Sequence, residues 1–307
     1  MKDTRFSDSE LNKISRFFNQ VMTEIYGLAR ENLEATTLVP KYNGIDEWAD
    51  TITYKVISEV GMAKYISDYA EDLPPISRLM ELKSAMIKEF GNSYEYSIFE
   101  LNKWLRAGVN LSRDEGDTAR RKIDETVDGI ILMGSEEARL PGFLNNPNVS
   151  FATIAKGAKD KTTWKDKTIN EIVADVQVMI DTVRLNSKKT IKADTLGINH
   201  DAFVYVSTTQ RDASSEQTIL EYLLKVFKGQ GISSIVEIAA LDGIGVGGTN
   251  RAVLYKKDPS CVAYILPIPF RQEQPQAQSL AYKVPCYCRI GGTVVKNVNS
   301  IVYADGI

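Results

Sequence analysis

Histidine and cysteine are nearly missing from this sequence of 307 residues, which contains one histidine and three cysteines. His200 is the single residue around which a Ser-His-Asp or Cys-His triad could form, and no serine or cysteine near it stands in a nucleophile motif. Cys286 and Cys288 would share one face of a strand, but a zinc site there would lack its third and fourth ligands. We therefore predict no catalytic residue, no metal site and no cofactor, and we expect that the protein is not an enzyme.

The sequence also lacks long apolar runs and a strong charge of either sign. No stretch approaches the roughly 20 consecutive apolar residues that cross a bilayer, and the first ten residues lack the apolar centre of a signal peptide. The net charge is −3, so strong bulk attraction to nucleic acid or to an anionic membrane is not expected. An odd number of cysteines without framework spacing suits a reducing compartment. We expect a protein that is made in the cytosol and has no membrane partner.

Two polar segments invite a functional interpretation that their residues do not support. Residues 243–250 read GIGVGGTN, but they lack the Gly-Lys-Ser/Thr ending of a phosphate loop and precede a predicted strand where a helix would be required. We interpret them as a flexible loop. Residues 151–167 form a polar connector whose lysines we interpret as solvated, namely Lys156, Lys159, Lys161, Lys165 and Lys167.

A long helical pattern covers residues 112–134. Ser112 and Glu115 have the spacing of a capping box, and apolar residues then recur at steps of three and four, as on one face of a helix. About 22 helical residues rise roughly 33 Å, which spans a small domain, so we predict a central spine helix. The apolar stripe consists of Ala119, Ile123, Val127, Ile130, Ile131 and Gly134, and the opposite charged face includes Arg120, Arg121, Asp124 and Asp128.

Four other helices and a set of strands complete the expected architecture. Capping residues predict helices after Ser7 or Ser9, after Ser97, after Thr168 and after Ser214, the last closed by Gly229. A polar turn is expected at residues 199–201. The predicted strands are residues 51–56, 79–89, 195–198, 232–239, 252–255, 262–266, 282–290 and 294–303. Because helices and strands are interleaved early and strands cluster late, the fold class is α+β.

The pattern of residues 44–95 predicts a long hairpin that projects from the body of the protein. Ile52, Tyr54 and Val56 alternate with polar residues, and Pro74 and Pro75 mark an irregular tip between two extended arms. The segment has few large aliphatic side chains for its length, which argues against burial in a core. A projecting hairpin exposes edge strands that proteins normally cover or pair with a partner.

Five segments, in order, resemble the phage major capsid proteins that are related to the encapsulin shell proteins. The tail is the most specific of them, and Phe143 is one departure, since an aliphatic residue is expected there. The matching stretches are residues 60–64 with 68–74 (VGMAK, DYAEDLP), 94–97 with Glu100 and Leu101, the spine helix, 142–149 (GFLNNPNV) and the tail 284–307.

The resemblance implies the Hong Kong 97-type capsid fold, in which an N-terminal arm, an extended loop, a peripheral domain and an axial domain follow one another. Residues 1–43 would form the arm, 44–95 the extended loop, 96–159 with 259–298 the peripheral domain, and 160–258 with 299–307 the axial domain.

The resemblance also implies a function. Many copies would assemble as pentamers and hexamers into an icosahedral shell that encloses a double-stranded DNA genome without sequence-specific binding, with scaffolding, portal and decoration proteins as further partners. The protein would be part of the virion capsid, assembled in the host cytoplasm. Expected contacts between subunits involve Phe17, Phe18, Tyr54, Lys64, Tyr65, Tyr69, Arg120 and Arg121, and the expected loop at the symmetry axes includes Gly243, Gly245, Gly247 and Gly248.

Three alternatives remain open at this stage. An encapsulin-like compartment would share the fold and hold protein cargo. A small-molecule enzyme would need a pocket with convergent polar groups, which the motifs do not indicate. A monomeric binding module would have to explain the projecting hairpin, which should then be disordered in solution.

Overall fold

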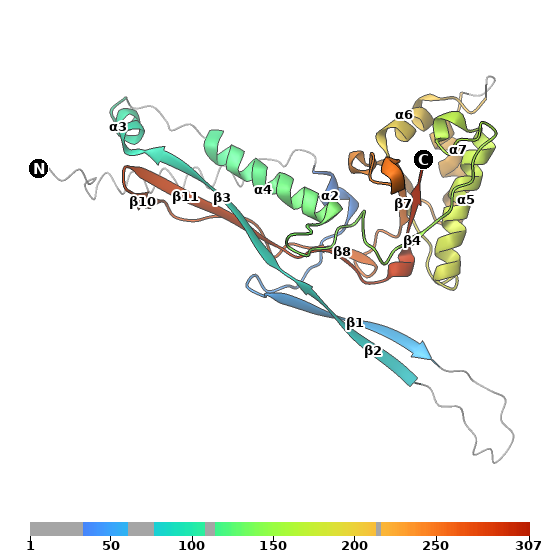
Figure 1. Cartoon of the computed structure of the whole chain (residues 1–307), viewed down its shortest axis with the longest axis horizontal. Coiled ribbons are helices and arrows are strands. Elements are labelled where there is room, and N and C mark those ends of the chain that lie inside the picture. Colours follow the sequence, from blue (N-terminus) through green and yellow to red (C-terminus); the bar gives the residue numbers. More distant parts are fainter. Residues whose placement is uncertain (1–32, 61–76, 108–113, 213–215) are drawn as a thin grey trace, which may run out of the picture.

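The computed structural model describes residues 33–60, 77–107, 114–212 and 216–307 (Figure 1). Several predictions concern residues outside these ranges and stay predictions. They are the first helix with Phe17 and Phe18, the hairpin residues Lys64, Tyr65 and Tyr69, the caps Ser112 and Ser214, and the stop at Gly108.

The predicted spine helix is α4 (Asp114–Met133), 20 residues that lie along a long antiparallel sheet (Figure 1). The sheet is built from β3 (Lys88–Ser97), β9 (Ile268–Gln272), β10 (Gln276–Gln278) and β11 (Ala281–Ile290), with β11 pairing with the other three. The apolar stripe is confirmed, because Ala119, Ile123, Val127, Ile130 and Ile131 are all buried.

The predicted hairpin is confirmed as β1 (Thr51–Val60) and β2 (Ser77–Met86). The two strands pair antiparallel over their full length, from Thr51 opposite Met86 to Val60 opposite Ser77. Figure 1 shows them extending away from the long sheet and from α4. β3 continues the chain from β2 but pairs with β11, so residues 88–95 lie in the sheet beneath α4 and not in the projecting hairpin.

A second body contains a five-stranded mixed sheet and three helices (Figure 1). The strands, in spatial order, are β4 (Ser150–Phe151), β13 (Ile301–Asp305), β7 (Arg251–Tyr255), β5 (Thr195–Ile198) and β6 (Ser234–Glu237). The helices are α5 (Ile169–Asn186), α6 (His200–Thr208) and α7 (Ile219–Phe227).

Short elements connect the two bodies and cover their ends. β8 (Val262–Ile265) pairs with β12 (Gly292–Val295), α2 (Glu34–Leu38) contacts α4, and α3 (Ile98–Ala107) follows β3. The Ser97–Glu100 cap of α3 is confirmed, since the Ser97 backbone N–H donates to the Glu100 carboxylate. Within the described part of the chain, 3₁₀ turns lie at Trp164–Asp166, Lys228–Gln230, Ala239–Leu241, Val246–Gly248 and Val298–Ser300.

The five-stranded sheet separates two hydrophobic cores. In β13, Ile301 and Tyr303 face the core beneath α4, whereas Val302 and Ala304 face the core formed with α5, α6 and α7. Because successive side chains of a strand point to opposite faces, one buried strand contributes to both cores. The sheet is therefore buried on both faces, and it couples the packing of the two bodies.

A helix replaces the polar turn predicted at residues 199–201. α6 begins at His200 with Asn199 as its N-cap residue, and its Ala202 and Val206 are buried in the second core. The helix contains several β-branched residues, which have low intrinsic helix propensity. Packing against the second core, and not local propensity, accounts for this helix.

The helix predicted after Ser214 begins later. Thr218 is its N-cap residue, and its hydroxyl accepts a hydrogen bond from the Glu221 backbone N–H at 3.3 Å. The chain then turns at Gly231, with φ +120, and not at Gly229. The predicted strand at residues 294–303 is likewise two strands, β12 and β13, separated by the turn at Val298–Ser300.

Lys167 differs from the other lysines of the connector. Its ammonium is buried, bonded to the Asp175 carboxylate at 2.6 Å and to the Ala155 carbonyl at 2.7 Å. The solvated interpretation is therefore wrong for Lys167, because the connector folds back over the start of α5. The predicted capping box of α5, Thr168 with Glu171, is present.

Candidate functional site

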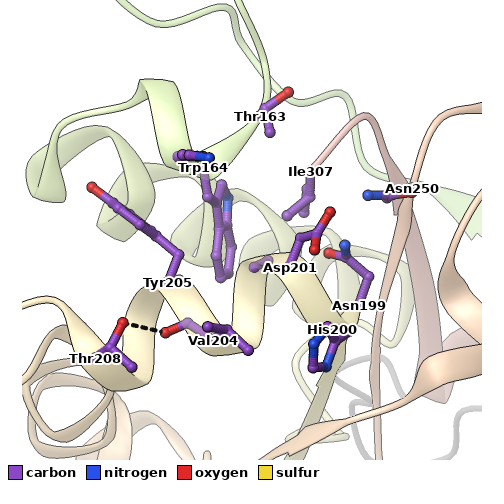
Figure 2. A pocket seen from close by; sticks show the side chains of 12 residues that line it. Thr163, Trp164, Asn199, His200, Asp201, Val204, Tyr205, Thr208, Asn250 and Ile307 are labelled. Atoms are coloured by element: carbon purple, nitrogen blue, oxygen red, sulfur yellow. Dashed lines mark hydrogen bonds between the residues drawn. The ribbon is translucent and has the colours of Figure 1, made fainter.

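A cavity of about 370 Å³ lies between the turn Trp164–Asp166 and the N-terminal half of α6 (Figure 2). Its walls are mixed. Val204 and Ile307 are apolar, Tyr205 and Trp164 are aromatic, and Asn199 is fully buried at its edge. Asn250, the last residue of the glycine-rich loop 243–250, also lines the cavity, so the loop predicted to lie at a symmetry axis ends beside it.

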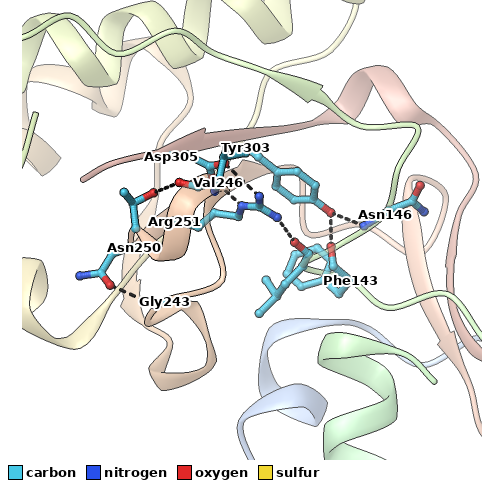
Figure 3. Close-up of polar contacts among 10 residues, drawn as sticks. Phe143, Asn146, Gly243, Val246, Asn250, Arg251, Tyr303 and Asp305 are labelled. Carbon is cyan, nitrogen blue, oxygen red and sulfur yellow. Dashed lines mark hydrogen bonds and ion pairs between the residues drawn. The ribbon is translucent and has the colours of Figure 1, made fainter. Parts of the chain in front are cut away.

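An arginine next to this cavity fixes the glycine-rich loop to the last strand (Figure 3). The Arg251 guanidinium binds both carboxylate oxygens of Asp305, at 2.6 and 3.0 Å, and donates to the Leu144 carbonyl at 2.8 Å. It also lies over the rings of Phe151 and Tyr303, 5.0 and 4.9 Å from their centroids. A bidentate, buried pair of this kind is strong and directional.

Tyr303 ties the loop at residues 142–149 to the same strand. Its hydroxyl donates to the Phe143 carbonyl and accepts from the Asn146 backbone N–H at 3.2 Å (Figure 3). Burial raises the pKa of Tyr303 above its ordinary value, so the phenol stays protonated and keeps donating. Two sequence segments singled out by the resemblance, this loop and the tail, are thus in direct contact.

The glycine-rich loop at residues 243–250 has a defined conformation. The Gly245 N–H donates to the Thr249 carbonyl at 2.7 Å, and the Val246 N–H donates to the Asp305 carboxylate at 3.0 Å. Gly243, Gly247 and Gly248 have positive φ values of 68, 74 and 75, which favour glycine. The predicted strand follows directly as β7, where a phosphate loop would require a helix.

The exposed tip of this loop presents one apolar side chain. Val246 is 76% exposed, the highest value among the large hydrophobic residues of the described ranges. Residues 246–249 are all exposed. The sequence pattern points to the glycines of this loop, but the exposed apolar side chain is that of the valine between them.

The predicted contact residues of the described part lie in different environments. Tyr54 is half-buried on the hairpin, packed near Ala85 and Ile87, and burial raises the pKa of its phenol. Arg121 is exposed on α4. Arg120 was expected on the exposed face but is only 8% exposed, since its guanidinium lies over the Phe270 ring, 5.7 Å from the centroid.

The hairpin carries exposed apolar side chains that sequence analysis missed. Leu82 and Met86 are 62% and 51% exposed on the same face of β2, and Trp48 before β1 is 63% exposed. The sequence pattern could have indicated them, because alternate residues of a strand face the same side. Ile52 and Tyr54 share one face of the hairpin, and Leu82 and Met86 share the other.

The cysteines and the histidine that were considered for catalysis are buried or paired with a carboxylate. Cys286 and Cys288 are buried thiols whose pKa burial raises to about 12. The exposed His200 ring bonds the Glu237 carboxylate at 2.5 Å. Within residues 33–60, 77–107, 114–212 and 216–307, no cluster of His, Cys, Asp and Glu side chains is placed to hold a metal ion, and no helix is long and apolar enough to cross a membrane.

Comparisons with known proteins agree with this architecture. The sequence matches the model of the family described as "Major capsid protein" over residues 61–307. No curated protein matches the chain.

Several solved structures are similar to the whole chain. The capsid of Myoviridae phage XM1 has a TM-score of 0.71 at 15% identity and covers 91% of this chain and 94% of its own. The capsid of a native GTA particle has a TM-score of 0.62 at 10% identity, covering 91% of each chain. A virus-like particle from Pyrococcus furiosus has a TM-score of 0.57 at 11% identity and covers 94% of this chain and 98% of its own. At these identities the likeness shows the fold.

Proposed function

Because this chain belongs to the major capsid protein family, we propose that its copies form the pentamers and hexamers of an icosahedral shell that encloses a double-stranded DNA genome. The protein is a structural protein of a viral capsid, with an α+β fold of the Hong Kong 97 type. We extend this to a protein that has no enzymatic activity, is assembled in the host cytoplasm, and works with scaffolding, portal and decoration proteins.

We propose a domain division that the two bodies and the hairpin support in part, since β4, in the range 96–159, pairs with β13 of the five-stranded sheet. Residues 1–43 are the arm, 44–95 the extended loop, 96–159 with 259–298 the peripheral domain, and 160–258 with 299–307 the axial domain. The spine helix α4 and its sheet support the peripheral assignment, and the five-stranded sheet supports the axial one. Within the extended loop, β1 and β2 are the part that projects, since β3 belongs to the sheet beneath α4.

One observation carries the assembly mechanism. The β1–β2 hairpin packs at its base against β8 and β12, extends away from the long sheet, and exposes Leu82 and Met86. Exposed strand edges and apolar side chains are normally covered by a partner. In the shell, the hairpin lies over α4 of a neighbouring copy, where the exposed Arg121 is available. Each subunit touches several others, so individually weak contacts act together. The expected contacts also include Phe17, Phe18, Tyr54, Lys64, Tyr65, Tyr69 and Arg120.

The charge distribution suits a container that holds DNA without gripping it. The net charge is −3. The lysines of the connector are partly neutralised, because Lys156 pairs with Asp160 and Lys161 pairs with Asp166, each at 3.0 Å. Non-specific affinity for DNA scales with the number of phosphates that cations neutralise, so ion pairs inside the protein lower it.

Electron microscopy and light scattering on the purified protein, at raised concentration and across salt concentrations, test this function. Closed shells or rings of five and six subunits are the expected result. A protein that stays monomeric even with its scaffold and portal proteins present would contradict the proposal.

A substitution on the hairpin tests whether its exposed apolar face contacts a neighbouring copy. Leu82→Ser removes an exposed side chain and leaves the fold intact, so circular dichroism should not change while the yield of shells falls severalfold. Glu81→Ala, its exposed neighbour on the opposite face of β2, is the matched control and should assemble normally. Equal yields from both variants would refute a contact through the face of the hairpin that carries Leu82 and Met86.

An encapsulin-like compartment with protein cargo is the second candidate, supported by the likeness to the Pyrococcus furiosus particle. The contents of particles purified from a producing cell separate the two functions. Nuclease-protected DNA of genome length is expected here, whereas a single co-purifying protein without such DNA would favour the compartment.

A further inference from the structure

One buried arginine joins the β1–β2 hairpin to the long sheet. Arg289, near the end of β11, is only 2% exposed, although its side chain carries a positive charge. An arginine is rarely buried to this extent unless its guanidinium is paired. β11 pairs with β3, β9 and β10. Arg289 is therefore attached to the central strand of the long sheet and not to the hairpin itself.

The Arg289 guanidinium bonds the chain on both sides of the hairpin. Before β1, its Nη1 atom donates to the Glu47 carbonyl at 2.6 Å, and its Nη2 atom donates to the Asp50 carboxylate at 2.9 Å. After β2, its Nε atom donates to the Glu89 carboxylate at 2.9 Å. Because the hairpin occupies the residues between these contacts, one side chain joins the two places where the hairpin leaves the sheet.

Two further contacts at the base of the hairpin are weaker guides to its direction. Arg271 of β9 pairs with the Glu47 carboxylate at 2.8 Å, but this pair is partly exposed and lies before β1 only. A small apolar cluster also packs there, formed by Ala85, Ile87, Ile265 and Val294. Apolar packing is non-directional, whereas the charge-assisted bonds of a guanidinium have a fixed geometry. The bonds of Arg289 are thus the contacts best suited to fix an angle.

The direction of the hairpin matters because the hairpin is a long lever (Figure 1). A paired strand rises roughly 3.4 Å per residue, so a tilt of about 10° at the base moves the far end of the β1–β2 ladder by about 5 Å. Apolar side chains lose contact when their atoms are more than about 4.5 Å apart. A hairpin with a loose base would therefore miss its place on a neighbouring copy, even with its own strands correctly paired.

We propose that Arg289 is a positioning residue for assembly, which fixes the direction of the β1–β2 hairpin and so presents Leu82 and Met86 to a neighbouring copy. The inference rests on the shell function proposed above and names the group that orients the hairpin contact. The side chains of Asp50 and Glu89 are 90% and 60% exposed, so water can solvate their carboxylates. Their bonds to the guanidinium therefore hold the hairpin and are not required to keep a buried carboxylate paired.

Substitution of an exposed carboxylate tests this role, because it leaves Arg289 in place within the sheet. Glu89→Ala removes the bond after β2 and keeps the bonds before β1. Glu95→Ala is the matched control, since Glu95 also lies on β3 and pairs with a cation of β11, Lys283, at 3.4 Å. The two glutamate side chains are similarly exposed, at 60% and 54%, but Glu89 lies at the hairpin end of β3 and Glu95 at the other end.

The distance between two spin labels measures the direction of the hairpin in unassembled subunits. Ser84→Cys on β2 and Lys122→Cys on α4 place the labels at exposed positions, and the native cysteines are buried. Glu89→Ala should broaden the distance distribution about twofold, because a hinge held on one side only samples more angles. Glu95→Ala should leave the distribution unchanged. Equal widths for the two variants, whether or not the unfolding midpoint falls, would overturn the inference.

The yield of shells, measured by light scattering and microscopy, connects the direction of the hairpin to assembly. Glu89→Ala should lower the yield severalfold, and Glu95→Ala should not. A normal yield from Glu89→Ala despite a broadened distribution would overturn the positioning role. The distance measurement needs no shells, so equal distributions refute this inference and leave the capsid function standing. Failure of the unsubstituted protein to assemble with its scaffold and portal proteins would instead contradict the capsid function itself.

Discussion

The Nζ atom of Lys167 lies 2.6 Å from Oδ2 of Asp175, and both side chains are almost completely enclosed by the protein. The Asp175 carboxylate also accepts from the Trp164 indole N–H at 3.1 Å, and the Lys167 ammonium donates to the Ala155 carbonyl. The pair joins the connector to α5 at the edge of the second core. It holds Trp164, which lines the cavity beside α6, in position.

Asp175→Asn should lower the free energy of unfolding by roughly 3–5 kcal/mol, because it leaves the buried Lys167 ammonium without its counter-charge. Denaturant titration followed by tryptophan fluorescence measures the loss. Asp166→Asn breaks pairs with the exposed Lys159 and Lys161 and should cost much less, because water screens these pairs. Similar losses from both variants would show that the buried pair contributes no more to the free energy of unfolding than the exposed pairs do.

Gly142→Ala should destabilise the protein by about 3 kcal/mol or more, since no small movement can make room for a methyl group. An added Cβ would lie 2.3 Å from the Met133 carbonyl carbon and 2.5 Å from the Gly134 nitrogen, both backbone atoms. Gly129→Ala is the matched control within α4, where an added Cβ meets nothing within 4 Å. It should stabilise the helix by about 0.5–1 kcal/mol. Thermal unfolding of both variants decides the matter, and a tolerated Gly142→Ala would contradict the close approach.

Arg251→Lys should cost about 1.5–3 kcal/mol and loosen the glycine-rich loop. A lysine cannot reproduce the two parallel bonds to Asp305 and the third bond to the Leu144 carbonyl. Hydrogen exchange should therefore accelerate across residues 243–250, where the Val246 N–H bonds the same carboxylate. Arg271→Lys, at a partly exposed pair with Glu47, should change stability by less than about 1 kcal/mol. Unchanged exchange in the loop would show that Arg251 does not hold it.

The His200–Glu237 pair should titrate above the ordinary pKa of histidine. Hydrogen bonding and charge attraction from Glu237 raise the pKa of His200 above 6.5. The folded state thus binds the proton more tightly, so the pair stabilises fully below about pH 6.5 and its contribution is lost as the pH rises through the raised value. Nitrogen-15 NMR of the single imidazole should report this pKa, and Glu237→Gln should return it towards 6.5. An unchanged pKa in that variant would refute the assignment.

Patterns among neighbouring residues predicted several helices and strands correctly. The stripe of α4, the capping box of Thr168 with Glu171, and the strand β5 were all confirmed. Each depends on residues within about one helical turn or on the two-residue period of a strand, so local sequence specifies them. The resemblance to capsid proteins, carried by five segments, was confirmed by the family match.

Helix α6 and the burial of Arg120 were missed for one common reason. α6 has a sequence with low helix propensity and forms because Ala202 and Val206 pack into the second core. Arg120 looks like a surface residue in its own helix, but Phe270, from a strand 150 positions later, lies beneath its guanidinium. Neither contact leaves a trace in the neighbouring residues.

The sequence alone determined the α+β class, the spine helix, the projecting hairpin and the capsid family, since these follow from periodicity, capping residues and the order of short segments. Only the tertiary structure decided which polar groups are buried and which partners they have. Lys167 pairs with Asp175, Arg251 pairs with Asp305, and the side-chain amide of Asn199 is hydrogen-bonded to no described residue. The physical reason is that burial depends on contacts between segments that are distant in sequence, whereas periodicity and capping are local properties.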